Sequence, residues 1–265
     1  MVQGRLTQSP PGRLQWFPQS AWQKEFAIAS EIGIKYIELI AEVQHNLNNP
    51  IWTDKGIKEI KQLVKDNSLT LHALCNDYIV EHSFLLEEVV EQNISLLNQV
   101  KKLGVEKYIM PFFDSSELTT SNMQDYIEPI KQVAKVANDG NILICLETIL
   151  KGQELIELLR LINMPNVKVV YDTGNRVAFG HDLSSDIRLL GERIAHVHIK
   201  DKNKDNENVL LGTGLVNFES VFYALNDINY VGPYTFETTR GSNPINTAKY
   251  NINVVNFFND NSKNA

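Results

Sequence analysis

VKVVYDTGNRVAFGHDLSSDIRLLGERIAHVHIK, residues 167–200, is the stretch that decides the fold. It begins with a short apolar run, VKVVYD (167–172), and ends with another, AHVHIK (195–200), and each run finishes in a polar or charged residue. Between them, LSSDIRLL (183–190) has the apolar spacing of a helix. A strand, a helix and a second strand in this order predict a parallel βαβ unit.

The same alternation extends along the rest of the chain without a break in composition. Strands are predicted at 2–6, 35–40, 69–75, 107–113, 142–147, 167–172, 195–200 and 233–237. Helices are predicted at 21–32, 54–65, 87–103, 121–137, 153–162, 183–190, 218–225 and 246–258. Eight strand–helix pairs in 265 residues predict a single (β/α)₈ TIM barrel over residues 1–259, with a polar C-terminal tail at 260–265. An open, doubly wound parallel sheet is the alternative with the same alternation.

Composition predicts a soluble, cytoplasmic globular protein. A hydrophobic fraction of 43% and a charged fraction of 22% exclude a disordered chain. No apolar run approaches the length of a membrane-spanning helix. A net charge of −7 argues against broad binding of nucleic acid or anionic membranes. Cys75 and Cys145 lie in apolar runs without metal-type spacing, which predicts two buried free thiols in a reducing compartment.

Four predicted strands end in side chains that can bind a metal. They are Glu147, Asp172, His198 and Glu237. In a barrel the carboxyl ends of the strands meet at one face, where active sites lie. Three carboxylates repel one another unless a cation lies between them. We therefore predict one divalent metal ion per chain, with Mn²⁺ favoured by this largely oxygen donor set and Mg²⁺, Co²⁺ or Zn²⁺ as alternatives.

The motifs around these residues resemble a known superfamily. YDTGN (171–175), HVHIKD (196–201), GTG (212–214) and FET (236–238), together with the opening QGRLTQSP, resemble the xylose isomerase-like barrels. That superfamily includes sugar and sugar-phosphate isomerases and epimerases. The resemblance implies that the four strand-end residues are metal ligands. It also implies that Glu147 and Glu237 exchange the proton, as the matching glutamates do in the ketose 3-epimerases.

Two positions depart from the epimerase pattern. Asn175 stands where those enzymes have a pocket histidine, and Lys204 stands where they have a substrate-binding arginine. The departure at Asn175 weakens an assignment to a tagatose- or psicose-type epimerase, while Lys204 is basic but not the same residue.

The predicted chemistry is sugar isomerisation or epimerisation through a metal-stabilised enediolate, with Glu147 and Glu237 as the acid/base pair. The substrate is a small carbohydrate. Its predicted binding residues are Asn175, Lys200, Lys204, Arg240 and Trp16. The loops after the last two strands contain lysine, arginine and glycine, so the sequence leaves open whether the substrate carries a phosphate.

Two other functions share parts of this pattern. An inosose-type dehydratase begins with the same proton abstraction, so the sequence separates it poorly from an epimerase. A nuclease like the AP endonucleases of the superfamily would need more histidines than the six in this chain and a basic surface. A regulatory barrel is disfavoured, because an idle cluster of buried carboxylates is destabilising. The oligomeric state is left open.

Overall fold

A computed structural model describes residues 1–263. The strands are β1 (Tyr36–Ala41), β2 (Thr70–Asn76), β3 (Lys107–Pro111), β4 (Leu143–Glu147), β5 (Val167–Asp172), β6 (Ile194–Ile199) and β7 (Tyr234–Phe236). Over the described residues they form one parallel sheet of seven strands, in the order β1 to β7. Consecutive strands are neighbours throughout, as expected of a barrel, and the open doubly wound sheet is excluded.

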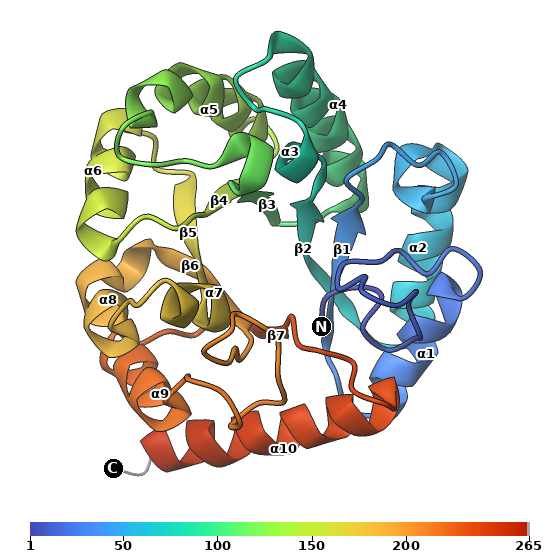
Figure 1. Cartoon of the computed structure of the whole chain (residues 1–265). Coiled ribbons are helices and arrows are strands. Elements are labelled where there is room, and N and C mark those ends of the chain that lie inside the picture. Colours follow the sequence, from blue (N-terminus) through green and yellow to red (C-terminus); the bar gives the residue numbers. More distant parts are fainter. Residues whose placement is uncertain (264–265) are drawn as a thin grey trace.

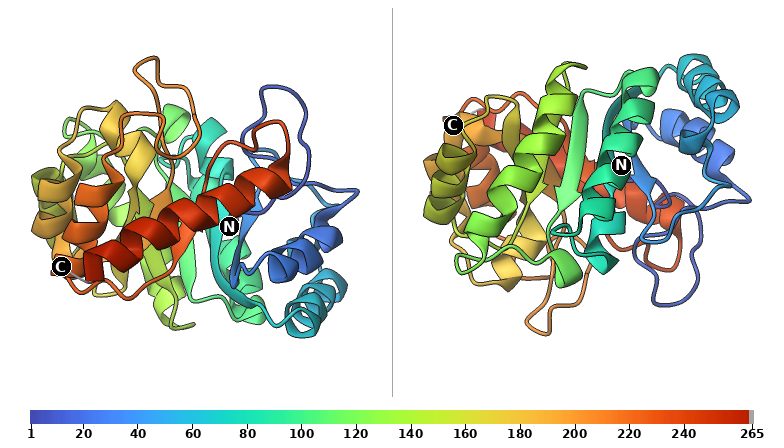
Figure 2. Two further views of the ribbon diagram at one scale, coloured as in Figure 1. Left: turned by 90° about the horizontal axis from the view of Figure 1, so that it is seen from below. Right: turned by 90° about the horizontal axis from the view of Figure 1, so that it is seen from above.

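Helices surround this sheet in chain order (Figure 1). They are α1 (Trp22–Glu31), α2 (Asp54–Asp66), α3 (Tyr78–Glu81), α4 (Glu87–Leu103), α5 (Met123–Asn138), α6 (Gly152–Ile162), α7 (Thr173–Ala178), α8 (Leu183–Leu190), α9 (Phe218–Asp227) and α10 (Pro244–Lys263). Three single turns of 3₁₀ helix lie at Pro50–Trp52, Asp114–Ser116 and Gly191–Arg193. Side views show α10 lying lengthwise along one flank (Figure 2). None of the helices within residues 1–263 is both long and apolar enough to cross a membrane.

The N-terminal residues take the place of an eighth strand, and here the predicted strand at 2–6 is corrected. Only Val2 forms a bridge, to Glu38 of β1. Its N–H donates to the carbonyl of Phe236 in β7, while the Gln3 N–H donates to the carbonyl of Glu38. The segment therefore joins the two ends of the sheet. It stops at Gly4, whose φ of +84° turns the chain and whose missing side chain leaves room for the Trp16 carbonyl.

Helix α4 illustrates why the predicted helices form where they do. Its buried residues recur every three or four positions, so one stripe faces the sheet. Two glutamates lie in its first turn and two lysines in its last, which complements the helix dipole. Gly104 ends the helix with a φ of +77°, a left-handed conformation that glycine adopts without steric cost.

Two differences from the predicted elements concern helices: two short helices were not predicted, and the last predicted helix ends later than expected. The short helices α3 and α7 follow directly on β2 and β5 and lack the length that gives a clear apolar period. At the C-terminus, α10 continues to Lys263, through most of the predicted polar tail. Residues 264–265 of that tail lie outside the described residues.

Candidate metal centre and cavity

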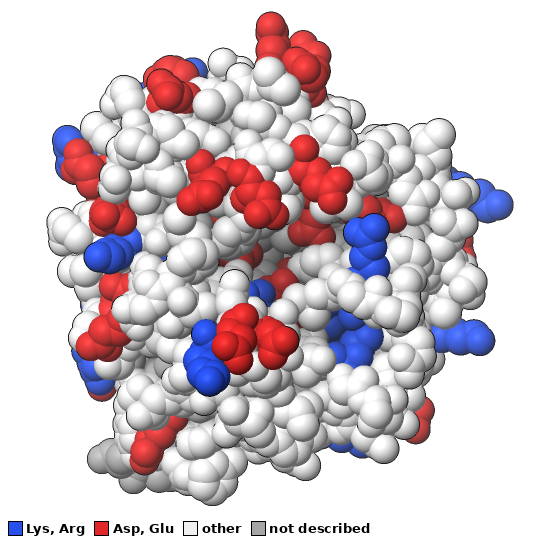
Figure 3. Space-filling model, in the orientation of Figure 1, with Lys and Arg blue, Asp and Glu red and all other residues white. Residues whose placement is uncertain are grey.

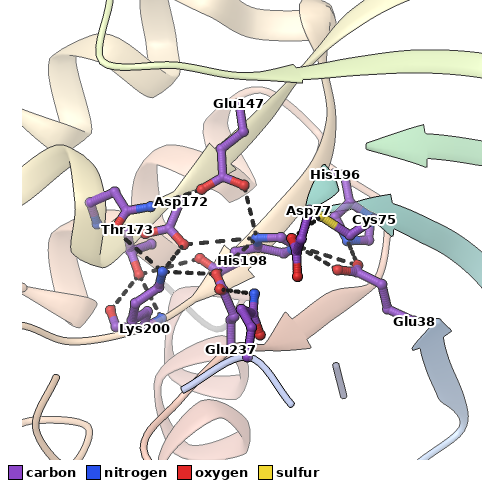
Figure 4. A network of polar contacts seen from close by, with 12 residues as sticks. Glu38, Cys75, Asp77, Glu147, Asp172, Thr173, His196, His198, Lys200 and Glu237 are labelled. Carbon is purple, nitrogen blue, oxygen red and sulfur yellow. Dashed lines mark hydrogen bonds and ion pairs between the residues drawn. The ribbon is translucent and has the colours of Figure 1, made fainter. Parts of the chain in front are cut away.

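The structure brings the four predicted strand-end residues together. Glu147 and Asp172 are the last residues of β4 and β5, His198 lies in β6, and Glu237 directly follows β7. One ligand atom from each lies within 4.8 Å of the others. His198 Nδ1 is 3.2 Å from Glu237 Oε2, 3.6 Å from Glu147 Oε2 and 3.8 Å from Asp172 Oδ2. Figure 4 shows Glu147 and Glu237 approaching this point from opposite sides of His198.

The inner atoms of this cluster fit a divalent cation. His198 Nδ1, Asp172 Oδ2 and Glu237 Oε2 are buried and have no hydrogen-bond partner among the described residues. Their close charged partners are one another and Lys200, and this convergence of buried ligand atoms fits a cation. The Lys200 ammonium lies 2.8 Å from Glu237 Oε2 and 3.1 Å from Asp172 Oδ2 and balances part of the negative charge. Three carboxylates and one imidazole form the largely oxygen donor set that suits Mn²⁺ or Mg²⁺.

Glu38, on β1, orients the histidines from behind. Its carboxylate lies 3.0 Å from His198 Nε2 and 2.7 Å from His196 Nε2. A carboxylate only accepts hydrogen bonds, so Nε2 of each ring carries the proton. The Nδ1 atom of a neutral His198 then has its lone pair free and directed at the three carboxylates. A carboxylate that fixes the tautomer of a ligating histidine in this way is typical of metal sites.

Burial and charge act in opposite directions on the acidic groups. Burial raises the pKa of Glu147 and of Asp172 above the ordinary range. Burial also acts to raise the pKa of Glu237, but the charges of Lys200 and His198 overcome it and hold that pKa well below the ordinary range. Without a bound cation, the positive charge at the cluster comes from Lys200 and His198, and from Arg5, whose Nη2 lies 3.8 Å from Glu237 Oε1.

Amide side chains support the outer edges of the carboxylates. Asn175 Nδ2 donates to Glu147 Oε1 over 2.8 Å, and Gln15 Nε2 donates to Glu237 Oε1 over 2.7 Å. Gln15 is itself held by Arg5, whose Nη2 donates to Gln15 Oε1 over 2.8 Å. These contacts leave the inner oxygens of Glu147 and Glu237 directed at the cluster.

The cluster forms the floor of a cavity of about 330 Å³, which Glu147, Asn175 and Glu237 help to line. A second cavity of about 580 Å³ adjoins it and shares Gln15, Val43 and Asp77 with it. Figure 3 shows the hollow at the centre of the face seen in Figure 1, with acidic side chains gathered along its upper rim. The combined space can hold a small polar molecule directly above the cluster.

Comparison with known proteins agrees with this geometry. The model of the xylose isomerase-like TIM barrel family matches residues 26–256, a range that contains all four cluster residues. The chain belongs to this family.

Two relatives and one solved structure that resemble this chain are named as sugar epimerases. Probable L-ribulose-5-phosphate 3-epimerase UlaE of Mycoplasma pneumoniae is 23% identical over 249 residues, which cover 88% of this chain and 81% of that protein. Ketose 3-epimerase of Arthrobacter globiformis is 30% identical over 174 residues, 58% of each chain. D-psicose 3-epimerase of Clostridium cellulolyticum H10, solved with D-tagatose, superposes with a TM-score of 0.75 at 18% identity, covering 90% of this chain and 93% of that one. The named relatives are isomerase-class enzymes.

The predicted substrate-binding residues occupy different places in this barrel. Asn175 lines the inner cavity, Trp16 lines the outer one, and Lys200 contacts the cluster. Lys204 is exposed on the loop after β6 and lines neither cavity. Arg240 is buried, and its guanidinium donates to the carbonyls of Gly4 and Arg13. The structure therefore brings three of the five to the cavities and the cluster.

Sequence reasoning missed Glu38, Gln15 and Asp77. The sequence could have pointed to Glu38, because a glutamate in the middle of the apolar strand YIELIA needs a partner if it is buried. Nothing in the sequence pointed to Gln15, since it lies in an irregular loop, where sequence pattern does not predict which way a side chain points. Asp77 follows the end of β2, where the same search for polar strand ends would have found it.

Proposed function

We propose that this protein is a divalent-metal-dependent epimerase of ketose sugars, with Glu147 and Glu237 as its two proton-transfer groups. The single observation that carries the proposal is the convergence of these carboxylates with Asp172 and His198 at the floor of a cavity. The names of the relatives support the reaction class.

The four cluster residues would hold the cation, with Mn²⁺ as the proposed metal. When bound, the cation polarises the substrate carbonyl and stabilises the negative charge that develops as the adjacent C–H bond ionises. One glutamate takes the proton from that carbon, and the other delivers a proton to the opposite face. The net result is inversion at one carbon with no change in composition. Two groups that approach from opposite sides of His198 suit this two-base chemistry better than a one-base isomerisation.

The other side chains position the substrate and the bases. Asn175 and Gln15 hold the outer oxygens of Glu147 and Glu237, which restricts both carboxylates to one orientation. Lys200 lies beside the cluster and can donate to a substrate oxygen. The two buried cysteines are unpaired, which supports a reducing, cytoplasmic setting.

Proton exchange with solvent tests the proposal. Mn²⁺-loaded protein is incubated in D₂O with a panel of free ketoses and ketose phosphates, and the metal is chelated before NMR spectra are recorded. We expect deuterium at the carbon next to the carbonyl, together with the epimer. The rate of epimer formation falls at least about 100-fold in Glu237→Gln, because removal of a proton-transfer group typically costs about 10²–10⁴-fold. Epimer formation that persists in Glu237→Gln rejects the two-base assignment, whereas exchange that persists without epimer formation fits Glu147 acting alone on its own face. Loss of water to a dicarbonyl product indicates the dehydratase instead.

A further inference from the structure

The described part of the cavities offers no free binding site for a phosphate group, and we propose that the natural substrates are ketoses without one. The inference rests on the proposed function and narrows it. It distinguishes this chain from relatives whose names specify a 5-phosphate. Three independent features carry it: the loop after β6, the loop after β7, and the charge of the cavity walls.

The loop after β6 has its backbone donors already engaged. TIM barrels often bind phosphate with the loops after the last two strands, where free N–H groups point at the anion. Here the N–H groups of Gly212 and Gly214 each donate to Asp201 Oδ2 over 2.9 Å, and that of Val216 donates to Asp201 Oδ1 over 3.1 Å. Asp201 is 0% exposed. Its carboxylate thus occupies the donors that a phosphate would use.

The same loop is packed too closely to release those donors. A side chain at Gly214 would collide with the Asp201 carboxylate and with the Lys202 carbonyl. The Leu215 N–H also donates to that carbonyl, over 2.8 Å. The turn is therefore built around Asp201, and it holds one internal anion in place of an external one.

Arg240, the cation in the loop after β7, is directed away from the cavities. Its Nε donates to the Gly4 carbonyl over 2.7 Å, and its Nη1 donates to the Arg13 carbonyl over 3.0 Å. The side chain ties down the N-terminal loop that carries Trp16, and it lines neither cavity. An arginine committed to two carbonyls has only part of its donor fork left for an anion.

The walls of the two cavities are acidic beyond the metal cluster. Their charged lining residues are Glu42, Glu81 and Asp114 against Arg13 and Lys202, with Asp77 and His45 as further titratable groups. Lys202 donates to Asn206 Oδ1 over 2.7 Å at the rim. A phosphate monoester carries a charge of about −1.5 to −2 at neutral pH, so these walls repel it. Amide side chains on the same walls, including Gln44 and Asn46, suit neutral hydroxyl groups.

Matched pairs of substrates test the inference. Mn²⁺-loaded protein is assayed with L-ribulose against L-ribulose 5-phosphate and with D-fructose against D-fructose 6-phosphate. We expect kcat/KM for the better free ketose to exceed that of its ester by about 100-fold or more, since like-charge contacts strongly disfavour a partner. We also expect inorganic phosphate not to inhibit turnover of the free sugar. An ester that reacts as well as its free ketose, or competitive inhibition by phosphate, overturns the inference and leaves the proposed function intact. Failure of both members of every pair overturns the proposed function and this inference with it.

A charge variant separates repulsion by the walls from the poor fit of a larger substrate. Glu81 and Asp114 line the cavities but lie outside the metal cluster. The double variant Glu81→Gln/Asp114→Asn should narrow the free-to-ester ratio of kcat/KM by about tenfold. The control Glu91→Gln/Glu219→Gln removes two exposed charges on the outer helices α4 and α9 and should leave that ratio unchanged. Equal ratios in both double variants would show that the acidic walls do not exclude the phosphate.

Discussion

Asp172 and Asp201 lie at the carboxyl ends of the neighbouring strands β5 and β6, but their carboxylates differ in how many backbone hydrogen bonds they accept. Asp172 ends β5, Asp201 lies just beyond β6, and the two residues are 1% and 0% exposed. Three backbone N–H groups donate to the carboxylate of Asp201, two of them to Oδ2 and one to Oδ1. In Asp172 a backbone N–H bonds only Oδ1, that of Asn175 over 2.6 Å, while Oδ2 faces the cluster and lies 3.1 Å from Lys200 Nζ.

This difference separates a structural carboxylate from a ligand. A buried carboxylate with all its acceptors satisfied is stable as it is and organises the loop around it. One whose second oxygen shares a single lysine with another carboxylate of the same buried cluster is costly unless a further cation joins it. Asp201, which accepts more hydrogen bonds than Asp172, is thus the aspartate to which we assign no role in metal binding or catalysis.

The largest expected effect is the loss of metal binding in Asp172→Asn. Asparagine caps a helix as well as aspartate does, so the substituted side chain keeps the bond to the Asn175 N–H and preserves α7. The cluster loses one charged ligand oxygen. We expect Mn²⁺ affinity to fall by more than about 100-fold, beyond the roughly 10- to 100-fold typical of outer partners of a metal site. Isothermal titration calorimetry on metal-free protein measures this directly. Unchanged affinity would remove Asp172 from the proposed ligand set.

Asp201→Asn should give the reverse pattern, with lower stability and normal metal binding. The amide keeps one oxygen acceptor but presents an NH₂ group to backbone donors, which leaves at least one buried N–H unpaired. We expect the free energy of unfolding of the metal-free protein to fall by about 3 kcal/mol. Urea denaturation checks the loss, and calorimetry should give an Mn²⁺ affinity within about twofold of the unmodified protein. A large loss of affinity without a loss of stability would contradict the comparison, because it would make Asp201 part of the metal site.

The sequence predicted which polar residues lie at the strand ends better than it predicted their hydrogen-bond partners. Alternation along β4 to β7 was enough to bring Glu147, Asp172, His198 and Glu237 to one face, since side-chain direction in a strand has a period of two. It did not distinguish Asp201 as a loop anchor, because the partners of Asp201 are backbone groups that sequence pattern does not place. The predicted strand at 2–6 failed for a similar reason. The tight packing of Gly4 against Trp16 depends on a loop contact, not on apolar period.

A third aspartate, Asp77, tests the same distinction between a satisfied and an unsatisfied buried carboxylate, because its contribution to stability depends on pH. It follows β2, lines both cavities and is 4% exposed. Its carboxylate accepts a hydrogen bond from the Cys75 thiol, whose Sγ lies 3.3 Å from Oδ1. Burial raises the pKa of Asp77 from 3.8 to about 7. The folded protein therefore binds this proton more tightly than the unfolded chain, and the contribution of Asp77 to stability falls as the pH rises from about 4 to about 7.

Asp77→Asn removes that dependence, so the variant gains stability relative to the unmodified protein as the pH rises. The difference in unfolding free energy should widen by about 2.5 kcal/mol between about pH 5 and pH 8, and it should level off above about pH 7. Urea denaturation at a series of pH values gives the difference, with Asp125→Asn on the exposed face of α5 as the matched control. A difference that stays flat across this range would mean that Asp77 is ionised in the folded protein. It would then belong with Asp201, as a carboxylate whose charge its surroundings satisfy, and the wall of the cavity would be more acidic still.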